Sequence, residues 1–174
     1  MHRVLFVATL IAMPTGALAD GGDDTPPPKP AVTCASGQIY DEKSKKCVKV
    51  EASTLDRDAL YSAVRQLAYA GRYHEAQIVL DAMDENDPGR LTYMGFTYRK
   101  LGDTDKANAY YEKAIAIDPA NHLARSYMGQ GFVAAGRIAD AKEQLQKIQA
   151  RGGTGTWSET SLRTAIATGS TYSY

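Results

Sequence analysis

The sequence has little of what catalytic and metal sites need. Its 174 residues include two cysteines, three histidines and one tryptophan, and 20 basic residues balance 20 acidic ones. A net charge of zero predicts no strong attraction to nucleic acid or to anionic membranes. Two thiols are too few for a closed zinc site, so we expect no metal and no cofactor.

Motifs of known chemistry are also lacking. His74 has no second histidine one helical turn away, as a zinc protease helix requires, and no serine occupies a Gly-x-Ser-x-Gly turn. Gly129-Gln130-Gly131 follows no strand pattern, which argues against a phosphate-binding loop. We therefore expect no catalytic residues and no enzyme, with a hydrolase as the least favoured alternative.

Long apolar runs are absent except at the N-terminus. An apolar run of about 10 residues from Val4 to Met13 follows Arg3 and precedes the small-residue motif Ala17-Leu18-Ala19. This run is half of what spans a bilayer, so residues 1–19 are predicted to be a signal peptide cleaved before Asp20. The alternative is an uncleaved anchor. The expected location is the periplasm, with no stable membrane insertion after cleavage.

Residues 20–33 have almost nothing to bury. They contain Pro26, Pro27, Pro28 and Pro30 among Gly and Asp, a composition typical of a stiff linker. A proline-rich ligand for another domain is the alternative.

The two cysteines, Cys34 and Cys47, flank a short polar segment. An even count in an exported protein favours a disulfide, and the flanking residues have the composition of two short strands. Residues 34–51 are therefore predicted to form a disulfide-linked β-hairpin, which the bridge would stabilise by roughly 3 kcal/mol. A redox pair or metal ligands are the alternatives.

Residues 91–153 contain one pattern twice, so that each position of the first copy has a counterpart at a fixed distance along the chain. Each copy combines large apolar, glycine, aromatic and alanine positions. The copies are Leu91, Met94, Gly95, Tyr98, Gly102, Ala107, Tyr111, Ala114, Pro119 and Arg125, Met128, Gly129, Phe132, Gly136, Ala141, Leu145, Ile148, Gly153. The apolar spacing within each half predicts a pair of helices, with a glycine able to adopt positive φ between them.

This pattern resembles the tetratricopeptide repeat in residue order and in its period of about 34 residues. The resemblance implies an all-α superhelix of about three helix pairs with a C-terminal capping helix, in addition to the hairpin. The units are a divergent first repeat over residues 54–88, then 89–120, 121–153, a cap over 155–169 with a helix from about Trp157 to Thr168, and a tail over 170–174. In the first repeat Pro88 is aligned with Pro119, which makes the turn into the second repeat three residues short.

The resemblance also implies a concave groove lined by the first helix of each pair. The predicted lining residues are Tyr61, Arg65, Tyr69, Thr92, Tyr93, Phe96, Arg99, Lys100, Tyr127 and Gln130. Exposed aromatics and arginines are typical of binding hot spots, although packing against neighbouring helices would explain the same pattern. The lysine and asparagine of chaperone-binding members are replaced here by Tyr61, Arg65 and Tyr93.

The resulting functional hypothesis is an exported adaptor that binds a peptide or a partner protein. Two alternatives come from other classes: an accessory protein of envelope polysaccharide assembly that binds glycan or a synthase partner, and a self-associating structural protein.

Replacing Cys34 with Ser tests whether the hairpin is a separate element. We expect faster limited proteolysis between residues 34 and 51 with unchanged helical circular dichroism, because the helices have their own apolar faces. Cys47→Ser should behave identically. Loss of helicity in either variant would show that the hairpin is part of the repeat fold.

Overall fold

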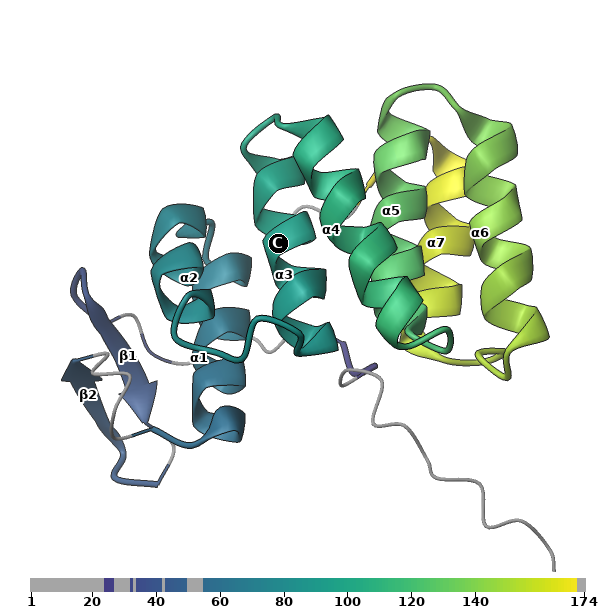
Figure 1. Ribbon diagram of the computed structural model, residues 1–174. Helices are drawn as coiled ribbons and strands as arrows, with labels where there is room; N and C mark the ends of the chain where they lie inside the picture. Colours follow the sequence, from purple (N-terminus) through teal and green to yellow (C-terminus); the bar gives the residue numbers. More distant parts are fainter. Residues whose placement is uncertain (1–23, 27–31, 33, 42, 50–54, 172–174) are drawn as a thin grey trace, which may run out of the picture.

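The computed structural model describes residues 24–26, 32, 34–41, 43–49 and 55–171. The predicted signal peptide and most of the predicted linker lie outside these residues. In the part of the chain that is described, seven helices succeed one another, with a two-stranded hairpin at the end nearest the first helix (Figure 1). Their bounds are β1 Gln38–Asp41, β2 Lys46–Lys49, α1 Arg57–Tyr69, α2 Tyr73–Leu80, α3 Pro88–Lys100, α4 Thr104–Ile117, α5 His122–Ala134, α6 Ile138–Ala150 and α7 Trp157–Thr168.

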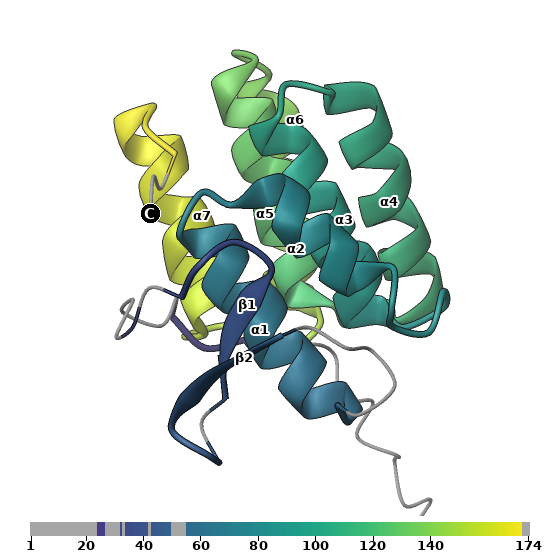
Figure 2. The same cartoon turned by 90° about the vertical axis from the view of Figure 1, so that its left-hand side faces the viewer.

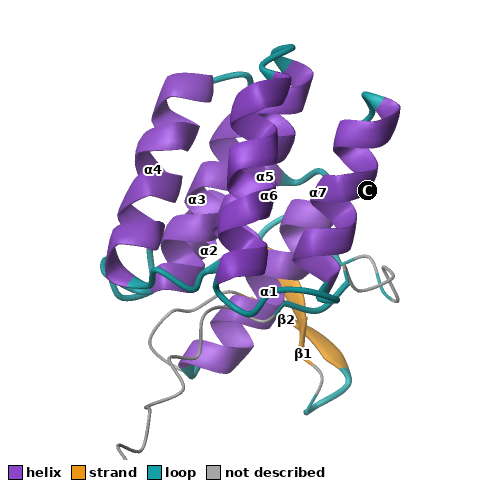
Figure 3. Ribbon diagram, turned by 90° about the vertical axis from the view of Figure 1, so that its right-hand side faces the viewer, coloured by secondary structure: helices purple, strands orange, loops and turns teal. Residues whose placement is uncertain are grey.

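The fold class is confirmed. Three helix pairs, α1–α2, α3–α4 and α5–α6, pack in series, and α7 packs against both α5 and α6 (Figure 3). α7 has the bounds that the sequence predicted. None of the helices in the described residues is long and apolar enough to cross a membrane.

Local signals explain where the helices begin and end. Asp87 and Asn121 occupy equivalent positions in successive repeats and cap α3 and α5, because each side chain accepts a hydrogen bond from a first-turn N–H. Gly102 and Gly136 follow α3 and α5 with φ of 92° and 72°. A residue with a Cβ is strained in this conformation, so glycine allows the chain to turn into the second helix of each pair.

The first repeat differs from the sequence prediction. Pro88 is the first residue of α3, whereas Pro119 precedes the cap of α5, so the two prolines are not equivalent. The shortening lies in the second helix, because α2 has 8 residues whereas α4 has 14 and α6 has 13. Proline suits the first helical position, where its missing N–H would have no intrahelical partner.

The hairpin is held on the first repeat by a charged cluster. The predicted disulfide joins Cys34 and Cys47, and β1 lies against α1 (Figure 2). Glu75 accepts hydrogen bonds from Arg72 Nη2 at 2.6 Å and from Gly37 N at 2.8 Å, and Arg72 Nη1 donates to Cys34 O at 3.1 Å. The Arg72 guanidinium and the Gly37 N–H lower the pKa of Glu75 to about 2, so the carboxylate is charged when it docks the hairpin.

The small residues of the repeat permit close helix contacts. A Cβ built on Gly95 of α3 would lie 2.5 Å from Tyr111 Cε1 and 3.0 Å from the backbone oxygen of Ala107, both in α4. A Cβ on Gly129 of α5 would lie 2.7 Å from Leu162 of α7. Gly95 therefore allows α3 and α4 to pack closely, and Gly129 leaves room for the capping helix α7 to pack against α5.

Gly95→Ala should destabilise the protein by about 1–3 kcal/mol, because the Tyr111 ring and the α4 backbone would have to move. This loss outweighs the gain of about 1 kcal/mol in helix propensity. Urea unfolding measures the difference. The matched control is Gly131→Ala, whose Cβ would meet only the flexible Arg99 Cδ at 3.1 Å. Equal stability of the two variants would contradict the close contact at Gly95.

Candidate functional site

A layer of aromatic side chains joins the first helices of all three pairs. Tyr69 of α1 shares its hydroxyl with Tyr93 of α3 at 2.7 Å and with Tyr127 of α5 at 2.5 Å. Tyr93 and Tyr127 occupy the same position in successive repeats. One phenol from each of the three helix pairs is thus brought to a single point.

The rings of this layer pack mainly edge to face. Tyr93 and Phe96 lie with centroids 6.0 Å apart, Phe96 and Tyr127 are 4.8 Å apart, and Trp157 of α7 extends the layer from Tyr127 at 6.3 Å. These distances are those of favourable aromatic pairs. Burial raises the pKa of Tyr69, and it raises the pKa of Tyr93 well above the ordinary value, so both phenols are neutral donors at physiological pH.

Most of the predicted groove residues belong to this buried layer. Eight of the ten are at most 8% exposed: Tyr61, Arg65, Tyr69, Thr92, Tyr93, Phe96, Tyr127 and Gln130. The expectation that their aromatic rings are exposed is wrong, because successive first helices approach closely enough for the rings to pack on one another. Whether any of the ten contacts a partner stays a prediction.

Two of the polar residues have structural partners. The Thr92 hydroxyl donates to Pro88 O at 2.7 Å and accepts from Asn121 Nδ2 at 3.0 Å, which links α3 to the cap of α5. Gln130 Nε2 donates to Ser161 Oγ of α7 at 3.0 Å. These side chains stabilise the contacts between repeats.

Arg99 and Lys100, at the end of α3, are only partly buried. The Arg99 guanidinium carbon and the Lys100 ammonium each lie 5.6 Å from the centroid of the Phe96 ring. Within the described residues, Arg99 Nε and Nη2 are buried and make no hydrogen bond of good geometry, although the guanidinium interacts with the buried Tyr111 hydroxyl. Burial and the neighbouring Arg99 charge lower the pKa of Lys100. Two adjacent cations at this position favour an anionic group supplied from outside.

A second cluster was not predicted from the sequence. It comprises Asp24, which lies in the predicted linker, Ser158 of α7, and His122 of α5. The His122 side chain is 16% exposed, and its ring Nε2 lies 3.2 Å from Arg151 O. No local signal marks Asp24, because its partner Ser158 is 134 residues away.

A pocket and the placement of possible metal ligands complete the description of the site. A half-open pocket of about 240 Å³ lies between the hairpin and α1, with Lys43 and Asp56 paired at 3.1 Å on its wall. Across the residues that the structure describes, no three His, Cys, Asp or Glu side chains gather as a metal site.

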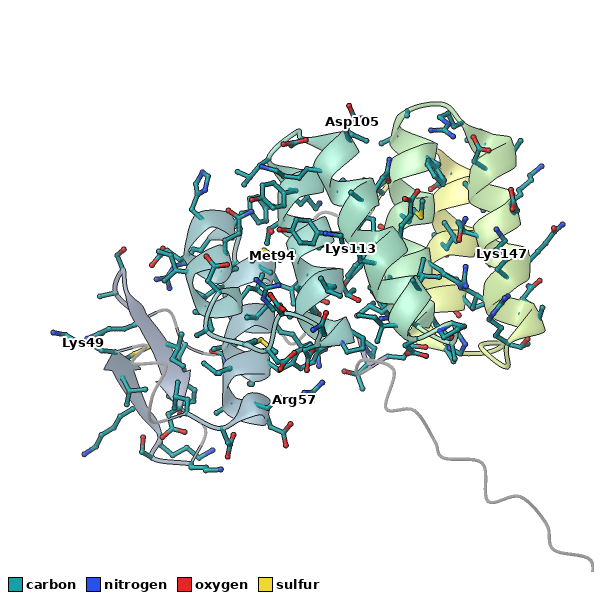
Figure 4. The ribbon with its side chains drawn as sticks, viewed as in Figure 1. Lys49, Arg57, Met94, Asp105, Lys113 and Lys147 are labelled. Carbon is teal, nitrogen blue, oxygen red and sulfur yellow. A yellow bond between two sulfur atoms is a disulfide. The ribbon has the colours of Figure 1, made fainter. Side chains whose placement is uncertain are left out.

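Ion pairs also tie the repeats together. Arg57, at the start of α1 (Figure 4), donates from Nε to Asp87 Oδ2 at 2.6 Å. Asp87 also caps α3, because its Oδ1 accepts a hydrogen bond from Arg90 N at 2.8 Å, so this one side chain joins the starts of α1 and α3.

Tyr69→Phe tests the shared hydroxyl. Because the Tyr93 hydroxyl would lose its bond at 2.7 Å inside the core, we expect a loss of about 1–3 kcal/mol in the free energy of unfolding. Tyr110→Phe on the outer helix α4, where the side chain is half-buried, should change it by about 0.5 kcal/mol or less. Equal losses in urea unfolding would show that the shared hydroxyl contributes nothing specific.

Comparisons with known proteins agree with this architecture. Residues 98–154 match the family model described as Tetratricopeptide repeat. The chain is 32% identical over 92 residues to Cellulose synthase 1 operon protein C of Komagataeibacter xylinus, covering 51% of this chain and 7% of that protein. It is 39% identical over 64 residues to an FK506-binding protein-like protein of Rattus norvegicus, covering 35% of this chain and 18% of that protein.

The matched region thus spans less than a fifth of either relative's length. No solved structure matches the chain. The fold is a tetratricopeptide-type helical repeat, residues 98–154 match the model of that repeat, and repeats of this kind are protein–protein interaction modules.

Proposed function

We propose that this chain is an exported adaptor that binds an extended, acidic segment of a partner protein along the inner helices of its repeats. The observation that carries the proposal is the pair Arg99 and Lys100. The partly buried Arg99 guanidinium lies next to the Lys100 ammonium, and a carboxylate from a partner would neutralise this pair of charges. Export to the periplasm rests on the apolar run from Val4 to Met13 and the motif that follows it.

The mode of binding follows from the burial of the aromatic rings. Tyr93, Phe96 and Tyr127 are each 0% exposed and offer no open surface on which a partner could stack. A partner would instead meet charged and hydrogen-bonding groups at the edge of the layer. Such groups recognise an extended chain through its carboxylates and backbone carbonyls.

A role in envelope polysaccharide assembly is the second candidate. The identity over 92 residues with a cellulose synthase operon protein favours it, although the aligned part is 7% of that protein. Because a sugar ring needs an exposed aromatic face to stack on, the buried rings favour contact with a protein of such an apparatus rather than with the glycan. Capture of a polysaccharide-synthesis protein in the experiment below would support this candidate.

The test uses a double variant of the tagged mature chain in which both Arg99 and Lys100 are replaced by Gln. Capture of partner proteins from envelope extracts of the cells that make this protein should fall about tenfold or more, because truncating buried charged contacts commonly costs about 2 kcal/mol or more. Helicity should not change, since neither side chain belongs to the buried layer.

The matched control replaces Lys106 and Lys113, two exposed cations of the outer helix α4, with Gln. This variant should capture the same partners as the wild type. Equal capture by both double variants would show that Arg99 and Lys100 do not take part in binding the partner. Sedimentation at dilute and concentrated protein would identify self-association if the captured partner is a second copy.

A further inference from the structure

Asp24, Thr25 and Pro26 lie against helices far from them in the sequence (Figure 1, short purple stretch). Asp24 Oδ1 accepts hydrogen bonds from Ser158 N at 2.9 Å and from the Ser158 hydroxyl, and Asp24 Oδ2 is 3.8 Å from His122 Nδ1. Ser158 is the second residue of α7, and His122 is the first residue of α5. The carboxylate therefore sits where two helices begin.

The groups that hold Asp24 form a built site. Ser158 is 0% exposed, and its N–H lies in the first helical turn, where no intrahelical acceptor is available. Thr156, the cap residue of α7, accepts from Glu159 N and leaves the Ser158 N–H for another acceptor. The partial positive charge at the start of the helix adds to the attraction for a carboxylate.

Arg65 of α1 holds the next two residues. Its Nη2 donates to Thr25 Oγ1 at 2.8 Å, to Pro26 O at 3.0 Å and to Thr25 O at 3.3 Å. Two of these three acceptors are backbone carbonyls, which any extended peptide presents. With the segment in place, Arg65 is only 8% exposed.

The bound segment is less buried than the groups that hold it. Thr25 and Pro26 are exposed, whereas Ser158 and Arg65 are buried. The segment thus lies over the site, and its departure would uncover hydrogen-bonding groups without opening the aromatic layer. A carboxylate followed by two carbonyls is the chemistry that the site recognises.

We propose that Asp24–Thr25–Pro26 is a tethered ligand that occupies a second peptide-binding place of this adaptor, formed by Ser158, His122 and Arg65, and that an extended acidic segment of the partner binds the same donors after displacing it. This inference rests on the proposed function and adds a binding place apart from Arg99 and Lys100. Seven residues separate Pro26 from Cys34, where the docked hairpin anchors the tether. Because the segment is covalently tethered, it rebinds without diffusing away, and a dilute free peptide competes at a disadvantage.

The test measures binding of a labelled peptide, Asp-Gly-Gly-Asp-Asp-Thr-Pro-Pro-Pro, which copies residues 20–28. Fluorescence anisotropy compares the mature wild-type chain with the Asp24→Ala variant. Because Asp24→Ala loosens the tethered copy and leaves the site intact, it should bind the peptide about tenfold or more tightly than the wild type. A peptide with Ala at the fifth position, which corresponds to Asp24, should not bind.

Double variants test whether peptide binding depends on the donors of the site. Asp24→Ala combined with Ser158→Ala, or with Arg65→Gln, should lose the gained affinity at unchanged helicity. The charge-matched control is Asp105→Ala, because Asp105 is exposed at the start of α4 and points away from the molecule (Figure 4). That variant should bind the peptide as weakly as the wild type does.

Equal peptide binding by the wild type and Asp24→Ala would overturn the proposal. So would a wild-type dimer that becomes monomeric in Asp24→Ala, since the segment would then be exchanged between two copies. The outcomes separate this proposal from the adaptor function. If partner capture depends on Arg99 and Lys100 but Asp24→Ala changes neither capture nor peptide binding, only the tethered ligand is wrong.

Discussion

The hydroxyl of Tyr69, shared between Tyr93 and Tyr127, is the contact on which the arrangement of the repeats depends. A helical repeat cannot bury its apolar face alone, so its stability comes from contacts with its neighbours. Here those contacts run through phenol groups that would be costly to bury without hydrogen bonds. Because α1, α3 and α5 each supply one phenol, the hydroxyls satisfy one another inside the core.

This shared contact also decides where a partner can bind. Once the rings of Tyr93, Phe96 and Tyr127 are packed together, the inner helices present donors and cations at the edge of the layer rather than an aromatic floor. Arg99 and Lys100 lie at the end of α3, and Arg65 and Ser158 hold the stretch from Asp24 to Pro26. Both places favour carboxylates and carbonyls. The proposed partner would thus be selected by its acidic groups and extended shape.

Much of the fold could be predicted from local patterns. The regular repeat spacing, the glycines after α3 and α5, and Thr156 before α7 are short-range signals that act on the backbone nearby. The same reasoning paired Cys34 with Cys47. It failed at Pro88, because proline is compatible with both the end of one repeat and the first position of the next helix. Only the cap at Asp87 separates the two possibilities.

The candidate site could be predicted only in part. The repeat resemblance placed Arg99 and Lys100 in the first helix of a pair, and the structure has them at the end of α3, but their role in a groove stays a prediction. The resemblance also placed buried tyrosines on an open surface. Residue type does not separate these cases, because tyrosine serves both in cores and at binding surfaces. Asp24 was assigned to a linker, since nothing near it in the sequence has a recognisable partner.

The sequence by itself determined the helices, their order, the disulfide and the class of repeat. The helices and the repeat depend on caps, glycines and apolar spacing within a few residues, and the disulfide depends on the number of cysteines. The tertiary structure alone decided that the aromatic layer is closed and that Asp24 meets Ser158 across 134 residues. The physical reason is distance along the chain. Burial and long-range hydrogen bonds depend on how closely successive repeats stack, and no local pattern specifies that spacing.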